Sequence, residues 1–191
     1  MAKVHKNIII EGLSGDLGKQ LRIQTSKISG QTYVFAKTNF ETRRKDSQAQ
    51  QAQKQAFWEA SAYADAHQTD PIYIAKAKGR KGKERQPRNV AMADWFHPPK
   101  ILEIDLLRWR GAAGEVIRIL AADDVRVAQV RVEIRDESGA SVEAGEATLR
   151  ITQWWEYAVQ GAMRGELTVT VFASDLPGHV TQASEKKTLP G

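Results

Sequence analysis

The sequence has no cysteine among its 191 residues. A disulfide framework, a thiolate zinc site and a cysteine nucleophile are therefore excluded, and several classes of enzyme are excluded with them. Long apolar runs are also missing, since none approaches the ~20 residues that a membrane-spanning helix requires. After the basic start of the chain, only residues 8–10 are consecutively apolar, which is too short for a signal peptide. We therefore expect a protein that is made in the cytoplasm without a signal peptide and has no membrane span.

Motifs that would indicate catalysis or a bound metal are missing too. The sequence contains neither a G-x-S-x-G elbow nor an H-E-x-x-H run. Its four histidines are His5, His67, His97 and His179, and they are far apart in the sequence, so we expect no metal site. Acid–base pairs such as Glu11 with Asp16, or Asp94 with His97, can only be chosen arbitrarily. We therefore expect that the protein is not an enzyme and uses no cofactor.

The net charge of +5 conceals an asymmetry between the two halves of the chain. Residues 1–97 contain 17 Lys and Arg against 9 Asp and Glu, whereas residues 98–191 contain 11 against 14. The two prolines at the change, Pro98 and Pro99, lack backbone donors and disfavour helix in the residue before them. This pattern predicts a basic domain over residues 1–97 and a second domain over residues 98–191.

The first half reads as an α+β domain of β-hairpins and two or three helices. Strands are predicted over residues 3–10, 20–28 and 31–37, and the last two form a hairpin across Ser29 and Gly30. Glycines at positions 12, 15 and 18 lie between the first two strands. Their spacing does not fit a phosphate-binding loop, because five residues separate the outer two and no helix follows. We interpret them as a tight turn.

A helix is predicted from Asp46 and Ser47 to about His67, because Ser47 and Gln50 make a capping box. Small and apolar residues recur at three- and four-residue spacing along it and define one face, which we expect to pack against the preceding hairpins. They are Ala49, Ala52, Ala56, Phe57, Ala60, Tyr63 and Ala64. A second helix is predicted from Asp70 and Pro71 through Ala77. A short third helix, capped by Asn89, carries the anchoring residues Met92, Trp95 and Phe96.

Between the second and third helices lies a strongly basic segment, residues 76–88. Its cations are Lys76, Lys78, Arg80, Lys81, Lys83, Arg85 and Arg88, and its one acid is Glu84. Such a segment is typical of a solvated loop, but it could also contact several phosphates. No base-reading element accompanies it, so this hypothesis is limited to non-specific binding of nucleic acid.

The second half shows the alternation and turn spacing of an all-β sandwich. Seven strands are predicted, over residues 100–107, 115–121, 125–135, 141–148, 154–159, 166–173 and 180–186. Val130, Val132 and Ile134 alternate with charged residues, which indicates one buried and one solvated face. Trp155 and Tyr157 share a face and are expected to fill the core.

The clearest strand and turn in the chain is the segment E-L-T-V-T-V-F-A-S-D-L-P-G-H-V, residues 166–180. Val169, Val171 and Ala173 share one face, and Asp175, Pro177 and Gly178 supply the turn. The A-S-D-L-P-G-H ending resembles the A-x-D-x-x-G-N pattern of bacterial immunoglobulin-like and fibronectin-like domains, with His179 in place of Asn. The resemblance implies an immunoglobulin-like β-sandwich and no particular activity.

The whole chain is also similar to an uncharacterised family of bacterial proteins of unknown function. The shared features are an S-G-x-L-G turn at residues 14–18, a glutamine-rich helix over residues 49–57, and an A-x-A-D-W-F close at residues 91–96. This resemblance implies an architecture and no mechanism.

Two further hypotheses concern ligands of the second half. The carboxylates of Asp123, Asp124, Asp136, Glu137 and Asp175 could bind calcium at loop ends. Adjacent aspartates at a turn more often accept hydrogen bonds from backbone amides, and no D-x-D-x-D-G run is present. Trp109 and Trp154, if they are exposed, could bind a sugar.

The function that fits these features is a non-enzymatic structural or interaction protein. We expect it to be a subunit of a repetitive assembly, such as a filament, a phage particle or an injection-type particle, with itself or other proteins as partners. Edge strands of a sandwich can pair with a neighbour, and the first strand begins almost at the terminus, so that it could be donated. The residues proposed for that strand are Val4, Ile8, Ile9 and Ile10. Nucleic-acid binding through residues 76–88 is the alternative.

Overall fold

The computed structural model describes residues 2–3, 13–18, 20–26, 30–36, 45–78, 85–151 and 153–190. The chain divides into two compact units, Met1–Gln51 and Ala52–Gly191. In the second unit the helices come first and the strands follow, and the change falls at Pro98 and Pro99. The division into domains over residues 1–97 and 98–191 stays a prediction. Together the elements make an α+β protein of three helices and three antiparallel sheets, among the residues described.

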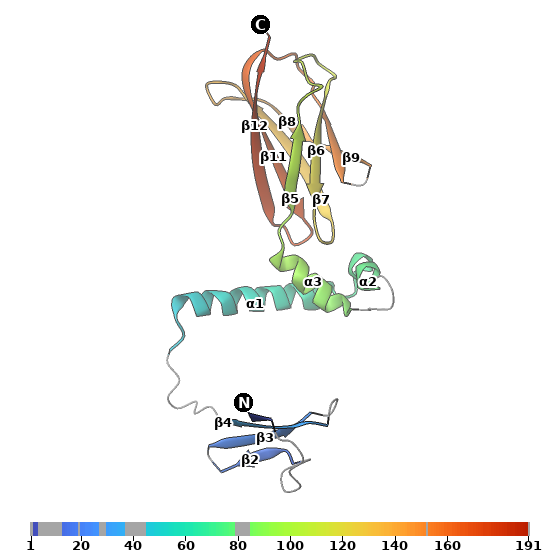
Figure 1. Cartoon of the computed structure of the whole chain (residues 1–191). Coiled ribbons are helices and arrows are strands. Elements are labelled where there is room, and N and C mark those ends of the chain that lie inside the picture. Colours follow the sequence, from blue (N-terminus) through green and yellow to red (C-terminus); the bar gives the residue numbers. More distant parts are fainter. Residues whose placement is uncertain are drawn as a thin grey trace. The chain divides into compact units, whose positions relative to one another are not determined.

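The first unit contains a four-stranded antiparallel sheet (Figure 1). Its strands are β1 (Ala2–Lys3), β2 (Gly15–Leu17), β3 (Leu21–Thr25) and β4 (Thr32–Ala36), in the order β1-β4-β3-β2. The predicted hairpin of β3 and β4 is confirmed. The glycine-rich segment, interpreted as a turn alone, also contains a strand, β2, which pairs with β3. Asp16 on β2 and Arg22 on β3 face each other and form an ion pair of 2.7 Å.

The first predicted strand, residues 3–10, is described only at its beginning. Ala2 and Lys3 pair with Val34 and Tyr33 of β4, so this part of the strand is bonded within the chain. The residues proposed for donation, Val4, Ile8, Ile9 and Ile10, lie outside the described residues. Donation of this strand therefore stays a prediction.

The three helices are α1 (Gln48–His67), α2 (Pro71–Ala77) and α3 (Pro87–Phe96). The predicted capping box begins α1, since the Ser47 amide donates to Gln50 Oε1 at 2.9 Å and the Gln50 amide donates to Ser47 Oγ at 3.3 Å. The third helix begins three residues earlier than predicted, at Pro87, with Gln86 and not Asn89 as its N-cap. Proline fits the first turn because it needs no hydrogen-bonding amide there. None of the described helices is both long enough and apolar enough to cross a bilayer.

The predicted packing face of α1 is buried only in its second half. Ala60 and Ala64 are fully buried, whereas Ala49 and Ala52 are exposed and Phe57 is 55% exposed, so the expectation of one continuous packed face is wrong. Ala64 belongs to a small core shared with α2, α3 and the turn after β6. The members of this core are Ala64, Tyr73, Ala77, Val90, Ala91 and Val125. Alanines allow this close approach because they carry no long side chain.

Eight strands form two four-stranded antiparallel sheets around one core, a sandwich-like arrangement that we call the paired sheets (Figure 1). The first sheet has the order β5 (Lys100–Asp105), β6 (Val116–Ala122), β10 (Trp154–Ala158) and β9 (Thr148–Ile151). The second has the order β12 (Val180–Leu189), β11 (Gly165–Asp175), β7 (Val127–Arg135) and β8 (Ser141–Glu146). All seven predicted strands are present. The eighth, β9, was not predicted, because the chain leaves one sheet and enters the other at the single residue Ala147.

The core of the paired sheets follows the predicted alternation. Its inward faces on β7 and β11 include six fully buried residues, Val130, Val132, Ile134, Val169, Val171 and Ala173. Trp155 and Tyr157 of β10 are buried in the same core, as predicted. Trp109, in the connection between β5 and β6, is fully buried there as well.

Candidate functional site

The basic segment is described at four of its seven cations, Lys76, Lys78, Arg85 and Arg88. Arg80, Lys81 and Lys83 lie outside the described residues. The Lys76 ammonium donates to the main-chain oxygen of Asp124 at 3.0 Å. Arg88 forms an ion pair of 2.5 Å with Asp65 and donates to Ser61 Oγ at 2.7 Å. Two of the described cations therefore join elements of the fold, while Lys78 and Arg85 are exposed.

Arg88→Gln is expected to lower the midpoint of thermal unfolding, because it removes the ion pair that joins α3 to α1. The hydrogen bond from Arg88 lowers the pKa of Asp65, so this stabilisation is present near neutral pH and is lost as the pH falls through that pKa. Arg85→Gln removes the same charge from an exposed position and is the matched control. Equal midpoints of the two variants at pH 7 would contradict a role of Arg88 in the fold.

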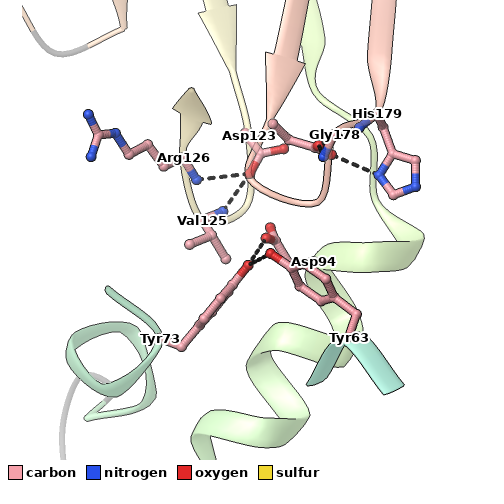
Figure 2. A network of polar contacts seen from close by, with 9 residues as sticks. Tyr63, Tyr73, Asp94, Asp123, Val125, Arg126, Gly178 and His179 are labelled. Atoms are coloured by element: carbon pink, nitrogen blue, oxygen red, sulfur yellow. Dashed lines mark hydrogen bonds and ion pairs between the residues drawn. The ribbon is translucent and has the colours of Figure 1, made fainter. Parts of the chain in front are cut away.

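A buried carboxyl on α3, that of Asp94, lies at the centre of a polar network between the helices and the turns of the paired sheets (Figure 2). The Tyr73 hydroxyl donates to Asp94 Oδ2 at 2.6 Å, and the Tyr63 and Tyr73 hydroxyls are 2.7 Å apart. Burial raises the pKa of Asp94 to about 7. The hydrogen bond from Tyr73 acts against this shift, and the negative charges of Asp123 and Asp175 add to it.

Asp123 and Asp175 lie in two turns of the paired sheets, after β6 and at the end of β11. Asp123 Oδ1 accepts hydrogen bonds from the amides two and three residues later, at 2.8 and 2.9 Å. Asp175 Oδ1 accepts from the amides of Gly178 and His179 at 2.8 and 2.7 Å, which confirms the predicted turn. His179 Nδ1 lies 3.0 Å from the second oxygen of Asp175. Both carboxylates therefore fix the conformation of their own turns.

The five acids predicted as calcium ligands do not gather at one point. Asp123 and Asp175 lie near Asp94, whereas the carboxylate of Asp124 contacts His97 Nδ1 at 2.7 Å. Asp136 accepts hydrogen bonds from Ser138 and Ala140 in its own turn, next to Glu137. In the part of the chain that the structure describes, no group of three or more acid, histidine or cysteine side chains could hold a metal ion. Calcium binding therefore has no candidate ligand set there.

The two tryptophans proposed for sugar binding are not freely exposed. Trp109 is fully buried, so a sugar-binding role for it is wrong. Trp154 is half-buried, and the Arg118 guanidinium lies 4.9 Å from its ring centroid. This stacking is a cation–π contact, which covers one face of the ring that a sugar would need.

An edge strand of the paired sheets with exposed apolar side chains is β9. It is the last strand of its sheet and pairs only with β10 in that sheet (Figure 1). All four of its residues are exposed, including Leu149 at 44% and Ile151 at 72%. Val142, on the edge strand β8 of the other sheet, is 49% exposed. One side of β9 thus offers backbone hydrogen-bonding groups next to apolar side chains.

The opposite edge, formed by β5 and β12, also exposes apolar side chains, Leu102 and Val180, but it carries more contacts and charges. The two strands contact each other across the sheets, and the Lys187 ammonium donates to the main-chain oxygen of Leu106 just after β5. The exposed part of β12 carries Glu185 and Lys186, and Lys186 is paired with Glu166 at 2.8 Å. Charged side chains of this kind commonly protect an edge from pairing. The edge at β9 has one such charge, Arg150, which pairs with Glu156 at 3.3 Å.

Comparisons with known proteins identify no family for this chain. No family model matches it, and no curated protein matches it. Among solved structures, it is similar to the crystal structure of CopC from Methylosinus trichosporium OB3b, with a TM-score of 0.38 and 14% sequence identity. The match covers 48% of this chain and 93% of that chain. The likeness is compatible with a β-sandwich and carries no argument about function. The two family resemblances seen in the sequence therefore stay predictions.

Proposed function

We propose that this chain is a non-enzymatic interaction protein that associates with copies of itself through the β9 edge of its paired sheets. The observation that carries the proposal is the exposure of Leu149 and Ile151 on a strand that, among the described residues, has a neighbour on one side only. An exposed strand edge of this kind is a template for pairing with another chain, by backbone hydrogen bonds and apolar contact.

The order of strands supports an immunoglobulin-like assignment of the paired sheets. With β5, β6, β9 and β10 taken as strands A, B, D and E, the first sheet has the order A-B-E-D of an immunoglobulin domain. With β7, β11 and β12 as strands C, F and G, the second has the order G-F-C, extended by β8. Domains of this kind serve many functions, so the interaction role rests on the edge and not on the fold.

The geometry of pairing decides which assembly forms. If β9 pairs with β9 of another copy, a two-fold axis closes the assembly as a dimer. If β9 pairs with a different edge of the next copy, the contact repeats and builds an open filament, as a phage or injection-type particle would require. An edge of four residues makes a small contact, so we expect association at high protein concentration.

Sedimentation velocity of the purified chain over a range of concentrations tests this proposal. The native chain is expected to associate as its concentration rises, and the double variant Leu149→Lys/Ile151→Lys is expected to remain monomeric, because two charges on the edge oppose pairing. The matched control is Phe57→Lys/Leu107→Lys, which changes two exposed apolar residues that lie on no edge strand of the paired sheets and should associate as the native chain does. A variant that lacks residues 1–10 shows whether the first predicted strand contributes to association.

A native chain that is monomeric at every concentration would overturn the proposal. Association of the Leu149→Lys/Ile151→Lys variant to the same degree as the native chain would also overturn it, since the contact would then lie elsewhere. Circular dichroism of each variant establishes that the fold is retained before the comparison is made.

A further inference from the structure

Two buried carboxylate oxygens in the network around Asp94 have no conventional donor. Asp94 is 1% exposed, and its Oδ1 has no hydrogen-bond donor among the described residues. The same is true of Asp123 Oδ2, which is also buried. The other oxygen of each carboxyl is satisfied, Asp94 Oδ2 by the Tyr73 hydroxyl and Asp123 Oδ1 by two amides of its turn. Buried polar atoms without a partner are rare and costly.

The two unsatisfied oxygens belong to carboxyls that are within hydrogen-bonding reach of each other. Two ionised carboxylates are both acceptors and can only repel. One proton placed between them turns one carboxyl into a donor, satisfies both oxygens at once, and leaves a single negative charge in the site. Aspartate pairs that share a site hold one proton in this way.

We propose that one proton shared between Asp94 Oδ1 and Asp123 Oδ2 fastens α3 to the turn after β6, and that its release to solvent at rising pH loosens this contact. The two carboxyls link α3 to that turn inside the buried network, beside the His97–Asp124 contact and the packing of Val125 on the helices, and Asp175 lies close by as a further negative charge. Loss of the proton therefore leaves repulsion where there was a hydrogen bond.

Several titratable or charged groups occur on the elements packed around the pair. They are Tyr63 and His67 on α1, Tyr73 and Lys76 on α2, His97 after α3, Asp124 and Arg126 beside Asp123, and Asp175 and His179 in the turn after β11. The cation Lys76 reaches a main-chain oxygen in the same turn and not the carboxyl pair. Burial raises the pKa of Tyr73, so its hydroxyl stays a donor to Asp94 at acidic and at neutral pH.

The direction of the pH effect follows from proton linkage. The pKa of Asp94 is about 7 in the folded chain and about 3.9 in an unfolded one. Between these values the folded state binds the proton and the unfolded state does not, so stability falls as the pH rises. The contribution is fully present below the unfolded pKa and is lost as the pH passes through about 7.

Thermal unfolding of the full chain at pH 5, 6, 7 and 8, at constant ionic strength, tests this inference. The native midpoint is expected to fall by about 5–10 °C from pH 5 to pH 8. Asp94→Asn should abolish this dependence, because an amide can donate to Asp123 and accept from Tyr73 at every pH. Asp124→Asn is the matched control on the adjacent residue and should keep the native slope.

Histidine protonation is the competing source of pH dependence near neutrality. Asp124→Asn removes the partner of His97, and His179→Gln removes the histidine beside Asp175, so a slope that survives in both variants does not come from these pairs. A native midpoint that is flat from pH 5 to pH 8, or an Asp94→Asn variant with the native slope, would overturn the inference.

A second measurement on the native chain does not depend on how a variant folds. In a titration followed by NMR of the aspartate carboxyl carbons, one resonance is expected to titrate above pH 6. If all aspartates titrate below pH 5, no shared proton exists near neutrality and the inference is overturned.

Discussion

Replacing Trp109 by alanine is expected to lower the free energy of unfolding by about 3–5 kcal/mol. Trp109 is the largest of the fully buried side chains and lies in the core shared by both sheets. Its removal leaves a cavity that the two sheets cannot close, because strands on either side hold their spacing through hydrogen bonds. Urea unfolding followed by circular dichroism measures the loss.

Two further variants separate cavity formation from other effects of changing a tryptophan. Trp154→Ala removes a half-buried ring and is expected to lower the free energy of unfolding clearly less than Trp109→Ala does. Trp109→Phe keeps most of the ring and removes an indole N–H that has no acceptor among the described residues, so its cost is expected to be smaller still. Equal losses for Trp109→Ala and Trp154→Ala would contradict the position assigned to Trp109.

Gly111→Ala is expected to be the more damaging of two chemically identical substitutions in the connection between β5 and β6. Gly111 has φ +98°, and a Cβ atom there would collide with the main-chain oxygen of Met163 and approach Leu189 Cδ1 to 3.1 Å. Gly114 has φ +84° with no atom within 4 Å of the same position, so Gly114→Ala is the matched control. Both variants bear backbone strain of about 1–2 kcal/mol.

The collision adds to this strain in Gly111→Ala alone. We expect an additional loss of about 1–3 kcal/mol, because the atom in the way belongs to the backbone and cannot move aside as a flexible side chain can. Met163 is also held close to Gly111, because the Met163 amide donates a hydrogen bond to the main-chain oxygen of Gly111 at 2.8 Å. If the two variants unfold at the same urea concentration, the close contact between Gly111 and Met163 is contradicted.

Strands were predictable where one face is buried and the other is solvated. Along β11, and on β7 from Val130 onward, the buried residues recur at every second position, and this period is that of a strand. The strand β9 was missed because its alternation covers only the four residues T-L-R-I, one residue after β8, too short a pattern to mark a separate strand. Edge strands are generally harder to predict from a sequence, because neither face of such a strand needs to be apolar.

Helix α1 shows which features of a helix a local sequence pattern can predict. The capping box of α1 is a local interaction between Ser47 and Gln50 and was predicted correctly. The extent of the buried face of α1 was not predicted correctly. Ala60 and Ala64 are buried and Ala49 is exposed, and this difference depends on where other elements end. Periodicity identifies a face, and tertiary contacts decide how much of it is covered.

The candidate sites are only partly visible in the sequence. Asp175 is recognisable as a turn residue because it bonds amides three and four positions away. The role of Asp94 is hidden because its contacts with Tyr73 and Asp123 span more than twenty positions. An acid inside the otherwise apolar run A-M-A-D-W-F is a signal that could have marked it as a buried carboxyl.

The β9 contact is tested most directly by spin labelling, which the absence of cysteine makes simple. A label on Thr148→Cys would lie on β9, and in an antiparallel β9–β9 pair the two labelled backbones would be about 10 Å apart. We predict dipolar broadening of the EPR spectrum at concentrations where the chain associates, and loss of the broadening on dilution with unlabelled protein. A label on Leu107→Cys should show none. Association without broadening at position 148 would contradict pairing of β9 with its own copy.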